Sequence, residues 1–376
     1  MNAPTRILHL HSSFALGGKE ARATRLMNLM GPRATHVILS AVPDALGARA
    51  AIAPDIAAEI PGAAAPALHG KPGLSRYRAL ARYMQGFDLV LSYNWGAMDG
   101  VMAHRLLSPF MTLPSLIHHE DGFNEDESVK RNWKRNMFRR LALPTAQALV
   151  VPSELLARIA RAEWGKRPAL IRNGVDVAAY AAPPDVAIPG LHRRAGDVVI
   201  GTIAGLRAVK DLPRLVRAVA ALPKHVRLVI VGEGPERETI IAEAERQGMA
   251  ERLIMPGFMA QPSRWIGHFD LLALSSHSEQ LPIAIIEAMA TGLAVASPSV
   301  GDVAAMVSPE NRPFIVSHPD QLSTALSTLA ADAKLRQRIG AANAERAAQL
   351  FDESIMVAAY DQLYASVLGG RSLFTA

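Results

Sequence analysis

The chain has 376 residues, half of them hydrophobic, with a net charge of +6 and no cysteine. A chain of this length is too long for a single hydrophobic core, so we expect two domains. The lack of cysteine excludes disulfides, thiolate nucleophiles and cysteine-ligated zinc. No apolar run reaches the roughly 18 residues that span a bilayer, and the N-terminus is typical of a buried strand rather than a signal peptide, so we expect a cytoplasmic protein.

Positive charge is concentrated in the first half of the sequence. Residues 1–176 contain 22 lysine and arginine residues against 14 aspartate and glutamate residues, whereas residues 177–376 contain 18 against 20. This asymmetry favours an anionic partner for the first half, such as a phosphate or a membrane surface. We do not expect a nucleic acid, because the basic residues are not interleaved with stacking aromatic residues.

Short apolar runs alternate with amphipathic stretches along the chain. A first series predicts buried parallel strands at RILHLHSS, HVILSAV, DLVLSY, PSLIHH and ALVVPS. A second series begins after about residue 182, at VVIGTIAG, VRLVIVG, LIMPGF, DLLALSS and LAVASPS. We expect an α/β protein with two doubly wound domains, at 1–180 and 181–355, joined by a Pro-, Ala- and Gly-rich linker at 178–197. Ligands of such sheets lie at the carboxyl ends of the strands, so the cleft between the domains is the expected site.

The loop FALGGKEA, residues 14–21, follows the first predicted strand. Gly17 and Gly18 would let the backbone approach a ligand, and the next helix would direct its N–H groups at an anion. The same pair of glycines also fits an ordinary turn, and it does not match the dinucleotide-binding fingerprint.

Four titratable residues, His118, His119, Glu120 and Asp121, directly follow the core of the strand at PSLIHH. Such a group is unexpected as core filling, so these residues are the acid and base candidates of the first domain. A metal site is the competing interpretation.

The stretch SVKRNWKRNMFRRLAL, residues 128–143, predicts a basic amphipathic helix. Trp133, Met137 and Leu141 recur at four-residue spacing, with Phe138 beside Met137. Six cations surround them, namely Lys130, Arg131, Lys134, Arg135, Arg139 and Arg140. This pattern is typical of interfacial binding and predicts docking on an anionic membrane surface. The alternative is that the apolar residues pack on the sheet and the cations face water.

The second half offers two cations after its first strand. Arg207 and Lys210 lie in the loop that follows VVIGTIAG, at the carboxyl end of a strand. Guanidinium and ammonium groups in that position could bind a diphosphate, or they could be ordinary surface charges.

The stretch SSHSEQLPIAIIEAMATG contains two carboxylates. Glu279 falls in a loop after a strand and Glu287 in the second turn of a helix, where its apolar neighbours argue against a surface position. Pro282 suits the first helical turn, and the amides near Gln280 and Leu281 make an anion-binding end. Carboxylates that accept hydrogen bonds from vicinal hydroxyls, beside amides that hold phosphate, match the groups of a sugar nucleotide.

Taken in order, the motifs resemble those of the retaining GT-B glycosyltransferases of family 4, the large group 1 sugar-transfer family. Glu279 to Glu287 resembles the family's E-x7-E motif, followed by A-M-A-x-G. The segments LIRNGVD, LVIVGEGPERE and MPGF resemble its N-G-V-D, G-x-G-P and P-G-F segments. The resemblance covers essentially the whole chain. It implies the GT-B fold, with two Rossmann-like domains and a C-terminal helix at 356–376 that crosses back onto the first domain.

The resemblance also implies roles for matching positions. Lys210 would bind the donor diphosphate, which the amide of Gly18 would meet from the other domain. Glu287 would accept hydrogen bonds from the ribose, and Glu279 with the amides after it would hold the donor sugar. Gly257 and Phe258 would lie near the base. The family has an active-site histidine near residues 119–121, which leaves His119 and Asp121 as candidates, and it needs no metal or other cofactor.

Two positions depart from the family pattern. Gly205 stands where the family usually has arginine, and Arg207, two residues on, could reach the same phosphates. Gln280 replaces a glycine of the usual E-G-x-P segment, which would narrow the sugar pocket.

The resemblance therefore implies a retaining, metal-independent glycosyltransferase. It would move a sugar from a nucleotide sugar to a hydroxyl of a glycan or lipid-linked acceptor, in cell-surface polysaccharide or glycolipid synthesis. A membrane-docking surface around Trp133, Lys134, Arg135 and Phe138 would bring it to that acceptor. The alternatives are a GT-B sugar-nucleotide epimerase and a non-catalytic protein that binds sugar nucleotides.

Overall fold

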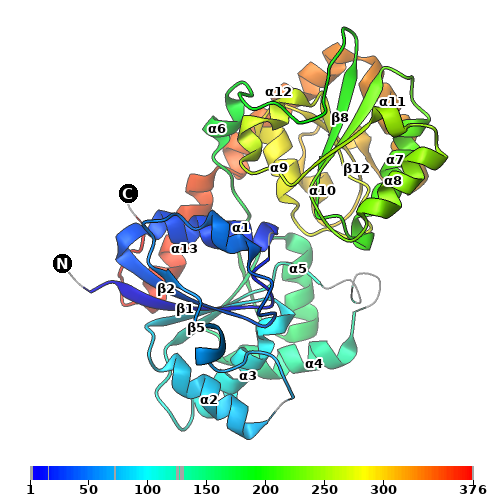
Figure 1. The fold of residues 1–376 in the computed structure, drawn as a ribbon. Helices are drawn as coiled ribbons and strands as arrows, with labels where there is room; N and C mark the ends of the chain where they lie inside the picture. The colour runs from blue at the N-terminus through cyan, green and yellow to red at the C-terminus, as the bar shows by residue number, and fades with distance from the viewer. Residues whose placement is uncertain (1–2, 16, 72, 124–126, 128–130, 375–376) are drawn as a thin grey trace. The chain divides into compact units, whose positions relative to one another are not determined.

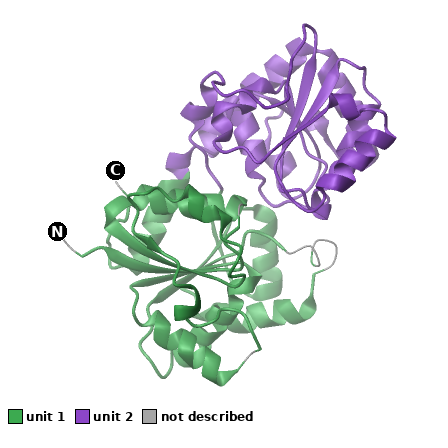
Figure 2. Cartoon of the chain, in the orientation of Figure 1, with its two compact units in different colours: residues 1–172, 356–376 green, residues 173–355 purple. Residues whose placement is uncertain are grey.

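The computed structural model describes residues 3–15, 17–71, 73–123, 127 and 131–374. The chain forms two compact units (Figures 1 and 2). Unit 1 comprises residues 1–172 and 356–376, and unit 2 comprises residues 173–355. Each unit is a parallel sheet with helices on both faces, as the alternating apolar pattern predicts.

Unit 1 is built on a seven-stranded sheet, counted within its described residues, in the order β3-β2-β1-β4-β5-β6-β7. Every adjacent pair of these strands is parallel. The strands are β1 (Thr5–His11), β2 (Ala34–Ser40), β3 (Ala58–Glu59), β4 (Leu89–Tyr93), β5 (Ser115–His119), β6 (Ala148–Val151) and β7 (Ala169–Leu170). The five strands predicted from the sequence are confirmed. The two that were not predicted, β3 and β7, have two residues each and leave no apolar run.

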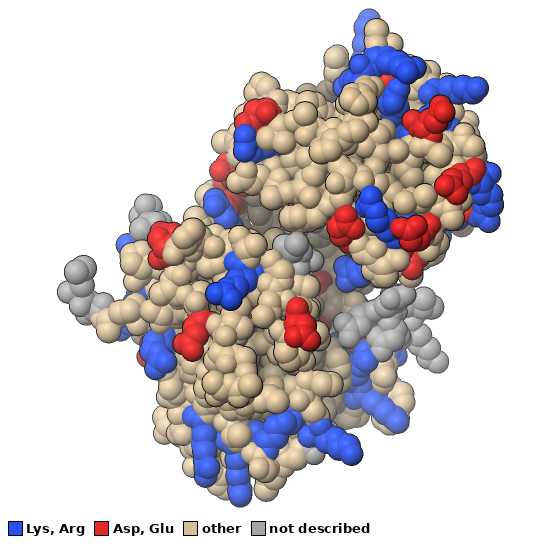
Figure 3. All heavy atoms as spheres, viewed as in Figure 1, with Lys and Arg blue, Asp and Glu red and all other residues tan. Residues whose placement is uncertain are grey.

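Helices cover both faces of this sheet because side chains alternate along each strand. In β1, Leu8 and Leu10 face one group of helices and Ile7 faces the other. The first group is α2 (Leu74–Met84), α3 (Met98–Leu107), α4 (Trp133–Ala142) and α5 (Glu154–Ile159). The second is α1 (Gly18–Met30) and α13 (Glu353–Val367). Lysine and arginine side chains gather on the side of unit 1 that α2 forms (Figure 3).

The last helix, α13, begins in unit 2 and continues on unit 1. Met356, Tyr360 and Tyr364 lie in the same core as Ile7 and Leu91, each with 3% or less of its surface exposed. The predicted return of the C-terminal helix to the first domain is therefore confirmed.

Unit 2 is built on a six-stranded parallel sheet, again counted among the residues described, in the order β10-β9-β8-β11-β12-β13. The strands are β8 (Val198–Ile203), β9 (Val226–Val231), β10 (Leu253–Gly257), β11 (Leu271–Ala273), β12 (Ala294–Pro298) and β13 (Ile315–Val316). Its helices are α6 (Val177–Ala181), α7 (Leu212–Ala220), α8 (Arg237–Arg246), α9 (Ile283–Ala290), α10 (Val303–Met306), α11 (Leu322–Ala331) and α12 (Ala333–Leu350). α7, α8 and α11 pack on one face of the sheet, and α6, α9 and α10 on the other.

The boundary between the units lies after Arg172 rather than at the expected residue 180. The segment expected as a linker is part of unit 2, because its side chains pack there. Tyr180 and Ile188 are buried in the core of unit 2, and Asp185 forms an ion pair with Arg264. No helix in the part of the chain that the structure describes is long and apolar enough to cross a membrane.

Candidate active site

Two loops meet at the carboxyl edge of the sheet in unit 2. The loop after β8 ends in Lys210, whose Nζ donates to Glu279 Oε1 at 2.5 Å, although 69 residues separate the two. Ser276 Oγ donates to the same carboxylate oxygen at 2.7 Å. Ser275 Oγ donates to the backbone carbonyl of Lys210 at 2.8 Å, which ties the two loops together. The structure thus brings together the predicted cation and the first carboxylate of the E-x7-E motif.

Arg207 lies in the same loop as Lys210 and is exposed. An exposed guanidinium in this loop is available to a ligand. A Cβ placed on Gly205 would lie 3.5 Å from Arg207 Nε. The guanidinium of Arg207 therefore occupies space beside the position at which an arginine was expected.

The next residue after Lys210 has a strained backbone. Asp211 has φ of 42°, in the left-handed region that non-glycine residues rarely adopt. Its carboxylate pairs with Arg214 at 2.6 Å and lies 3.1 Å from His277 Nε2. These partners offset the strain and fix the turn that presents Lys210.

The second carboxylate of the motif, Glu287, is almost fully buried in α9, with 8% of its surface exposed. Its Oε1 accepts a hydrogen bond from the hydroxyl of Tyr180 at 2.8 Å. Burial raises the pKa of Glu287 to about 7, and the bond from Tyr180 acts in the opposite direction. Sequence analysis missed Tyr180, because this residue fell in the supposed linker.

The residues between the two carboxylates are held by their backbone carbonyls. The Leu281 carbonyl accepts from Asn173 Nδ2 at 3.2 Å, and the Gln280 carbonyl accepts from the Asp302 N–H at 3.0 Å. Pro282 is the residue before α9 rather than a member of its first turn. The N-G-V-D segment thus supplies Asn173 as a support for this loop.

Close backbone packing shapes the neighbouring strand ends. A Cβ on Gly232 would lie 1.9 Å from the carbonyl oxygen of Ala204, so only glycine allows this approach. Gly257, with φ of 90°, ends β10, and a Cβ there would lie 2.8 Å from Glu233 Oε1. Phe258 follows with 54% of its surface exposed. Its ring is free to stack on a planar group.

In unit 1, the glycine pair begins α1. Gly18 is its first residue, and Gly17 precedes it with no side-chain cap. The buried carboxylate of Glu20 turns back over this end, with Oε2 2.7 Å from where a Cβ on Gly17 would lie. Lys19 contacts the same carboxylate, and burial raises the pKa of Glu20 although Lys19 opposes the shift. The carboxylate of Glu20 therefore lies where the sequence predicted the anion of a ligand. Glu20 was not predicted as a residue of this site.

The two candidates His119 and Asp121 have different surroundings in the structure. Asp121 accepts two hydrogen bonds from the guanidinium of Arg22, at 2.5 and 2.9 Å. Burial alone would raise the pKa of Asp121, but Arg22 outweighs it and holds the pKa below its ordinary value. Asp121 is therefore a paired carboxylate.

His119 is buried and neutral, because burial lowers its pKa to about 3. Its Nδ1 lies 3.3 Å from the carbonyl oxygen of Ser92, which can only accept, so Nδ1 carries the proton. Its Nε2 is left as an acceptor with no partner among the described residues. No group of three or more histidine, aspartate or glutamate residues in the described ranges is arranged as metal ligands.

The helix predicted to face a membrane is α4, and its apolar row is exposed. Trp133, Met137 and Leu141 have 70%, 50% and 58% of their surfaces exposed, so the alternative that they pack on the sheet is wrong. Phe138 is half-buried and packs on the core of unit 1.

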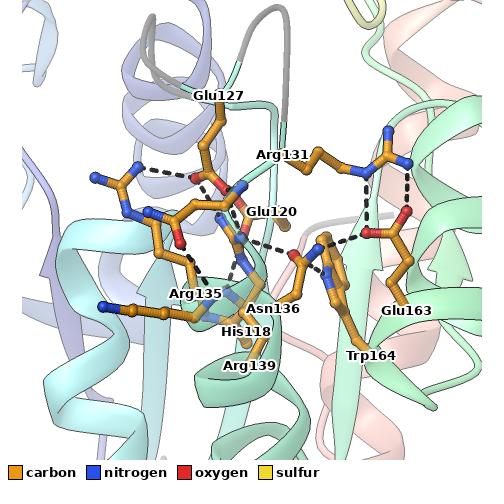
Figure 4. Close-up of polar contacts among 11 residues, drawn as sticks. His118, Glu120, Glu127, Arg131, Arg135, Asn136, Arg139, Glu163 and Trp164 are labelled. Atoms are coloured by element: carbon orange, nitrogen blue, oxygen red, sulfur yellow. Dashed lines mark hydrogen bonds and ion pairs between the residues drawn. The ribbon is translucent and has the colours of Figure 1, made fainter.

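The surrounding cations were predicted to be exposed, which is wrong for Arg139 and largely wrong for Arg135. The side chain of Arg135 is only 20% exposed. Arg139 is fully buried and pairs with Glu120 and Glu127, and Arg135 pairs with Glu127 at 2.9 Å (Figure 4). The reason is that carboxylates from the segment before α4 lie beneath the helix. Arg131 pairs with Glu163, Lys130 falls outside the described residues, and Lys134 and Arg140 are exposed.

Comparison with known proteins places this geometry in a wider group. A family model described as "Glycosyl transferases group 1" matches residues 188–346. The chain is 30% identical to the D-inositol 3-phosphate glycosyltransferase of Xylanimonas cellulosilytica over 317 residues, which cover 78% of this chain and 76% of the relative. It is 25% identical to the lipopolysaccharide core biosynthesis glycosyltransferase LpsD of Rhizobium meliloti, covering 58% of this chain and 63% of that protein. Several other matches span about half the length of the curated relatives.

Solved structures show the same GT-B fold. The structure of Anabaena HepE in complex with UDP and glucose superposes with a TM-score of 0.78 at 19% identity, covering 97% of this chain and 100% of that one. The structure of WaaG, a glycosyltransferase involved in lipopolysaccharide biosynthesis, superposes with a TM-score of 0.68 at 14% identity, covering 97% and 100%.

Proposed function

Because the chain belongs to the group 1 glycosyltransferase family, we propose that it is a retaining, metal-independent enzyme that moves a sugar from a nucleotide sugar to a hydroxyl group. The arrangement at the carboxyl edge of the sheet in unit 2 supports this most directly. There Lys210 contacts Glu279, and Glu287 lies buried on the helix that follows. The cations and the N-terminal end of a helix suit the phosphates of a sugar nucleotide, and the carboxylates suit its hydroxyls.

In the proposed reaction, the bond between the anomeric carbon and the diphosphate breaks while the acceptor hydroxyl attacks the same face. Lys210 and Arg207 stabilise the charge that develops on the leaving diphosphate, and the departing phosphate takes the proton of the acceptor hydroxyl. The products are the glycoside and the nucleoside diphosphate. Groups that stabilise developing charge typically contribute about 100- to 1000-fold each to the rate.

The substrate hydroxyls need acceptors. Glu287 would accept hydrogen bonds from the ribose, and Glu279 would hold the donor sugar once Lys210 turns to the diphosphate. His119, whose buried Nε2 has no hydrogen-bond partner among the described residues, is the first-domain residue that we assign to a substrate hydroxyl. The first amides of α1 would serve a substrate phosphate in place of Glu20.

The test of this function combines binding and turnover. UDP-sugars are the first donors to screen by thermal shift, because the HepE structures contain UDP and UDP-glucose. We expect Lys210→Ala to lower the rate of transfer at least 100-fold while the protein stays folded, and the exposed control Lys224→Ala to leave it unchanged. Near-normal turnover in Lys210→Ala would contradict the assignment. Release of an isomerised donor would identify an epimerase instead, and donor binding without release of nucleoside diphosphate would identify a non-catalytic protein.

Metal independence has its own test. Lys210, Arg207 and backbone amides supply positive charge for the diphosphate in this scheme, so no divalent cation is required. We expect excess EDTA to leave the rate of transfer within about twofold of the untreated enzyme. Loss of activity that Mg²⁺ or Mn²⁺ restores would overturn this part of the mechanism.

We further propose that the acceptor is lipid-linked and that unit 1 docks on an anionic membrane through α4. The support is the exposed row Trp133, Met137 and Leu141, flanked by the exposed cations Lys134 and Arg140. Aromatic and aliphatic side chains beside cations are suited to the headgroup region of a bilayer. Cations near an anionic leaflet contribute about 1 kcal/mol each, so two exposed cations add about 2 kcal/mol to the insertion of the apolar row.

Co-sedimentation with vesicles tests the docking surface. We expect binding to vesicles that contain phosphatidylglycerol, and a loss of most of it in Trp133→Ser/Met137→Ser and in Lys134→Glu/Arg140→Glu. Leu74→Ser, which removes an exposed apolar side chain of α2, is the matched control and should bind normally. Binding that ignores both lipid charge and these changes, or no binding at all, would favour a soluble glycan acceptor.

A further inference from the structure

The segment that follows β5 is held from both faces of the sheet. His119 is the last residue of β5, and Glu120 and Asp121 come directly after it, with the Glu120 N–H donating to the Val150 carbonyl at 3.0 Å. Successive side chains of extended backbone point to opposite faces. Glu120 therefore points to the face that carries α4, and Asp121 points to the face that carries α1. A different arginine meets each of them.

On the α4 face, Arg139 is fully buried and reaches Glu120 Oε2 with Nε at 3.1 Å. A second carboxylate, Glu127, lies 3.4 Å from Arg139 and is also bound by Arg135 (Figure 4). The guanidinium of Arg139 is stacked within an aromatic enclosure, 5.1 to 5.5 Å from the ring centroids of Trp95, Phe123 and Trp164. This one side chain thus joins α4 to both ends of the segment 120–127.

On the α1 face, Arg22 binds both oxygens of Asp121, in the two-pronged geometry that fixes orientation as well as distance. The backbone of the same segment is held by Asn94, which follows β4. Its Oδ1 accepts from the Asp121 N–H at 2.7 Å, and its N–H donates to the His119 carbonyl at 2.8 Å. Asn94 has φ of 58°, a conformation that a non-glycine residue keeps only when its surroundings impose it.

This amount of buried charge is not explained by stability alone. The three carboxylates Glu120, Asp121 and Glu127 and the two arginines Arg22 and Arg139 bear a large desolvation cost. Apolar residues of similar size often stabilise a core as well or better. What a buried, hydrogen-bonded ion pair supplies is a defined geometry. The side chain that shares the α1 face of this segment is His119, whose Nε2 is buried and without a partner among the described residues.

We propose that Arg139 and Asn94 are positioning residues for sugar transfer: together with Arg22 they fix the backbone of residues 119–121, and so the place of the His119 imidazole. This inference rests on the proposed function, because it assigns that segment to a substrate. Neither residue contacts a substrate in this scheme. We call Arg139, Asn94 and Arg22 the clamp. A displacement of about 1 Å at a group that positions a substrate can lower the rate about 100-fold, and the clamp prevents an effect of this size.

The test uses variants of the full chain that loosen the clamp and keep its charge or its backbone conformation. Arg139→Lys retains the positive charge but loses the planar guanidinium that donates to two carboxylates at once. Asn94→Gly retains the positive φ but loses the Oδ1 acceptor. We expect each to lower kcat for transfer at least tenfold, with Kd for UDP within twofold of the wild type, and to speed hydrogen exchange in peptides that contain residues 119–121. Arg158→Lys, at an exposed position of α5, is the matched control and should change none of these.

The outcomes separate this inference from the proposed function. A wild type that binds nucleotide sugar but transfers nothing would contradict the proposed function, and the clamp with it. A wild type that transfers sugar, with clamp variants that exchange faster yet transfer at the normal rate, would contradict the clamp alone. If Arg139→Lys does not fold, Glu127→Gln removes one partner of Arg139 and leaves Glu120 in place, and the same pattern of lowered kcat and unchanged UDP binding is expected.

Discussion

Glu287 illustrates how a single carboxylate can be positioned for binding at a cost in stability. Its carboxylate is buried in unit 2, and the one hydrogen bond that it accepts from a described residue comes from the hydroxyl of Tyr180. A carboxylate so enclosed gains from any further donor, and the two hydroxyls of a ribose are such donors. Burial raises the pKa of Glu287 from an ordinary 4.5 to about 7, because no such donor offsets the loss of water.

At the residue scale, we predict how the stability of unit 2 depends on pH through Glu287. The unfolded chain ionises this carboxyl near pH 4.5 and the folded protein near pH 7, so this group lowers the stability of unit 2 as pH rises from about 5 to 8. The difference corresponds to about 3 kcal/mol. We expect Glu287→Gln to become more stable relative to wild type by up to that amount between pH 5 and pH 8, measured by urea unfolding of unit 2. Glu310→Gln, at an exposed position, is the control, and parallel pH profiles for wild type and Glu287→Gln would contradict the prediction.

At the level of elements, the strands that carry the site were predictable because each is a run of apolar residues between turns. The E-x7-E spacing likewise predicts a loop carboxylate and a helix carboxylate. The pairing of charges was not predictable in the same way. In sequence, Arg135 and Arg139 differ in no visible way from the exposed Lys134 and Arg140, and only the fold brings Glu120 and Glu127 beneath α4. Tyr180 was missed for a related reason. A stretch rich in alanine and proline has no hydrophobic periodicity that would indicate which side chains pack in a core.

The second prediction tests close packing of α12 on the turn after α9. Alanine normally stabilises a helix by about 1 kcal/mol over glycine. At Gly340, however, a Cβ would lie 1.9 Å from the carbonyl oxygen of Gly292. We therefore expect Gly340→Ala to destabilise unit 2 by about 1–3 kcal/mol, the usual cost of overpacking.

A control on the same helix separates packing from propensity. Ala341→Gly, at the exposed neighbouring position, should cost about 1 kcal/mol through helix propensity alone. Both variants are measured by thermal and urea unfolding. A Gly340→Ala protein that is more stable than wild type would show that the turn at Gly292 moves away at little cost.

At the level of the whole molecule, the buried histidines of unit 1 and the buried Glu287 of unit 2 have opposite responses to acid. His9, His11, His36 and His119 are buried in unit 1, and burial lowers the pKa of each below its ordinary 6.5. The unfolded chain binds protons at these histidines first, so each removes about 1.4 kcal/mol of stability per pH unit below about 6.5, until its folded pKa is reached. Glu287 in unit 2 has the reverse effect, because its raised pKa favours the folded state as pH falls.

The third prediction is that unit 1 unfolds at a higher pH than unit 2. Three of the four tryptophans lie in unit 1 and the fourth is Trp265, so the fluorescence of Trp265→Phe reports unit 1 alone. We expect acid titration of this variant to show an unfolding transition between about pH 6 and 4, while calorimetry at the same pH still detects unit 2. A single transition for both units, or earlier loss of unit 2, would contradict the prediction.

The course of α13 has a consequence for synthesis on the ribosome. Unit 2 is one continuous stretch, but unit 1 is completed only by Met356, Tyr360, Tyr364 and Phe374. Together with α1 these residues cover one face of a sheet whose strands were made before unit 2. At translation rates of about 5–20 residues per second, that apolar face waits on the order of ten seconds or more for its cover. During this interval unit 2 can fold, while unit 1 is a substrate for chaperones. Deletion of residues 356–376 would therefore leave unit 2 folded and make the first-synthesised unit the one that aggregates.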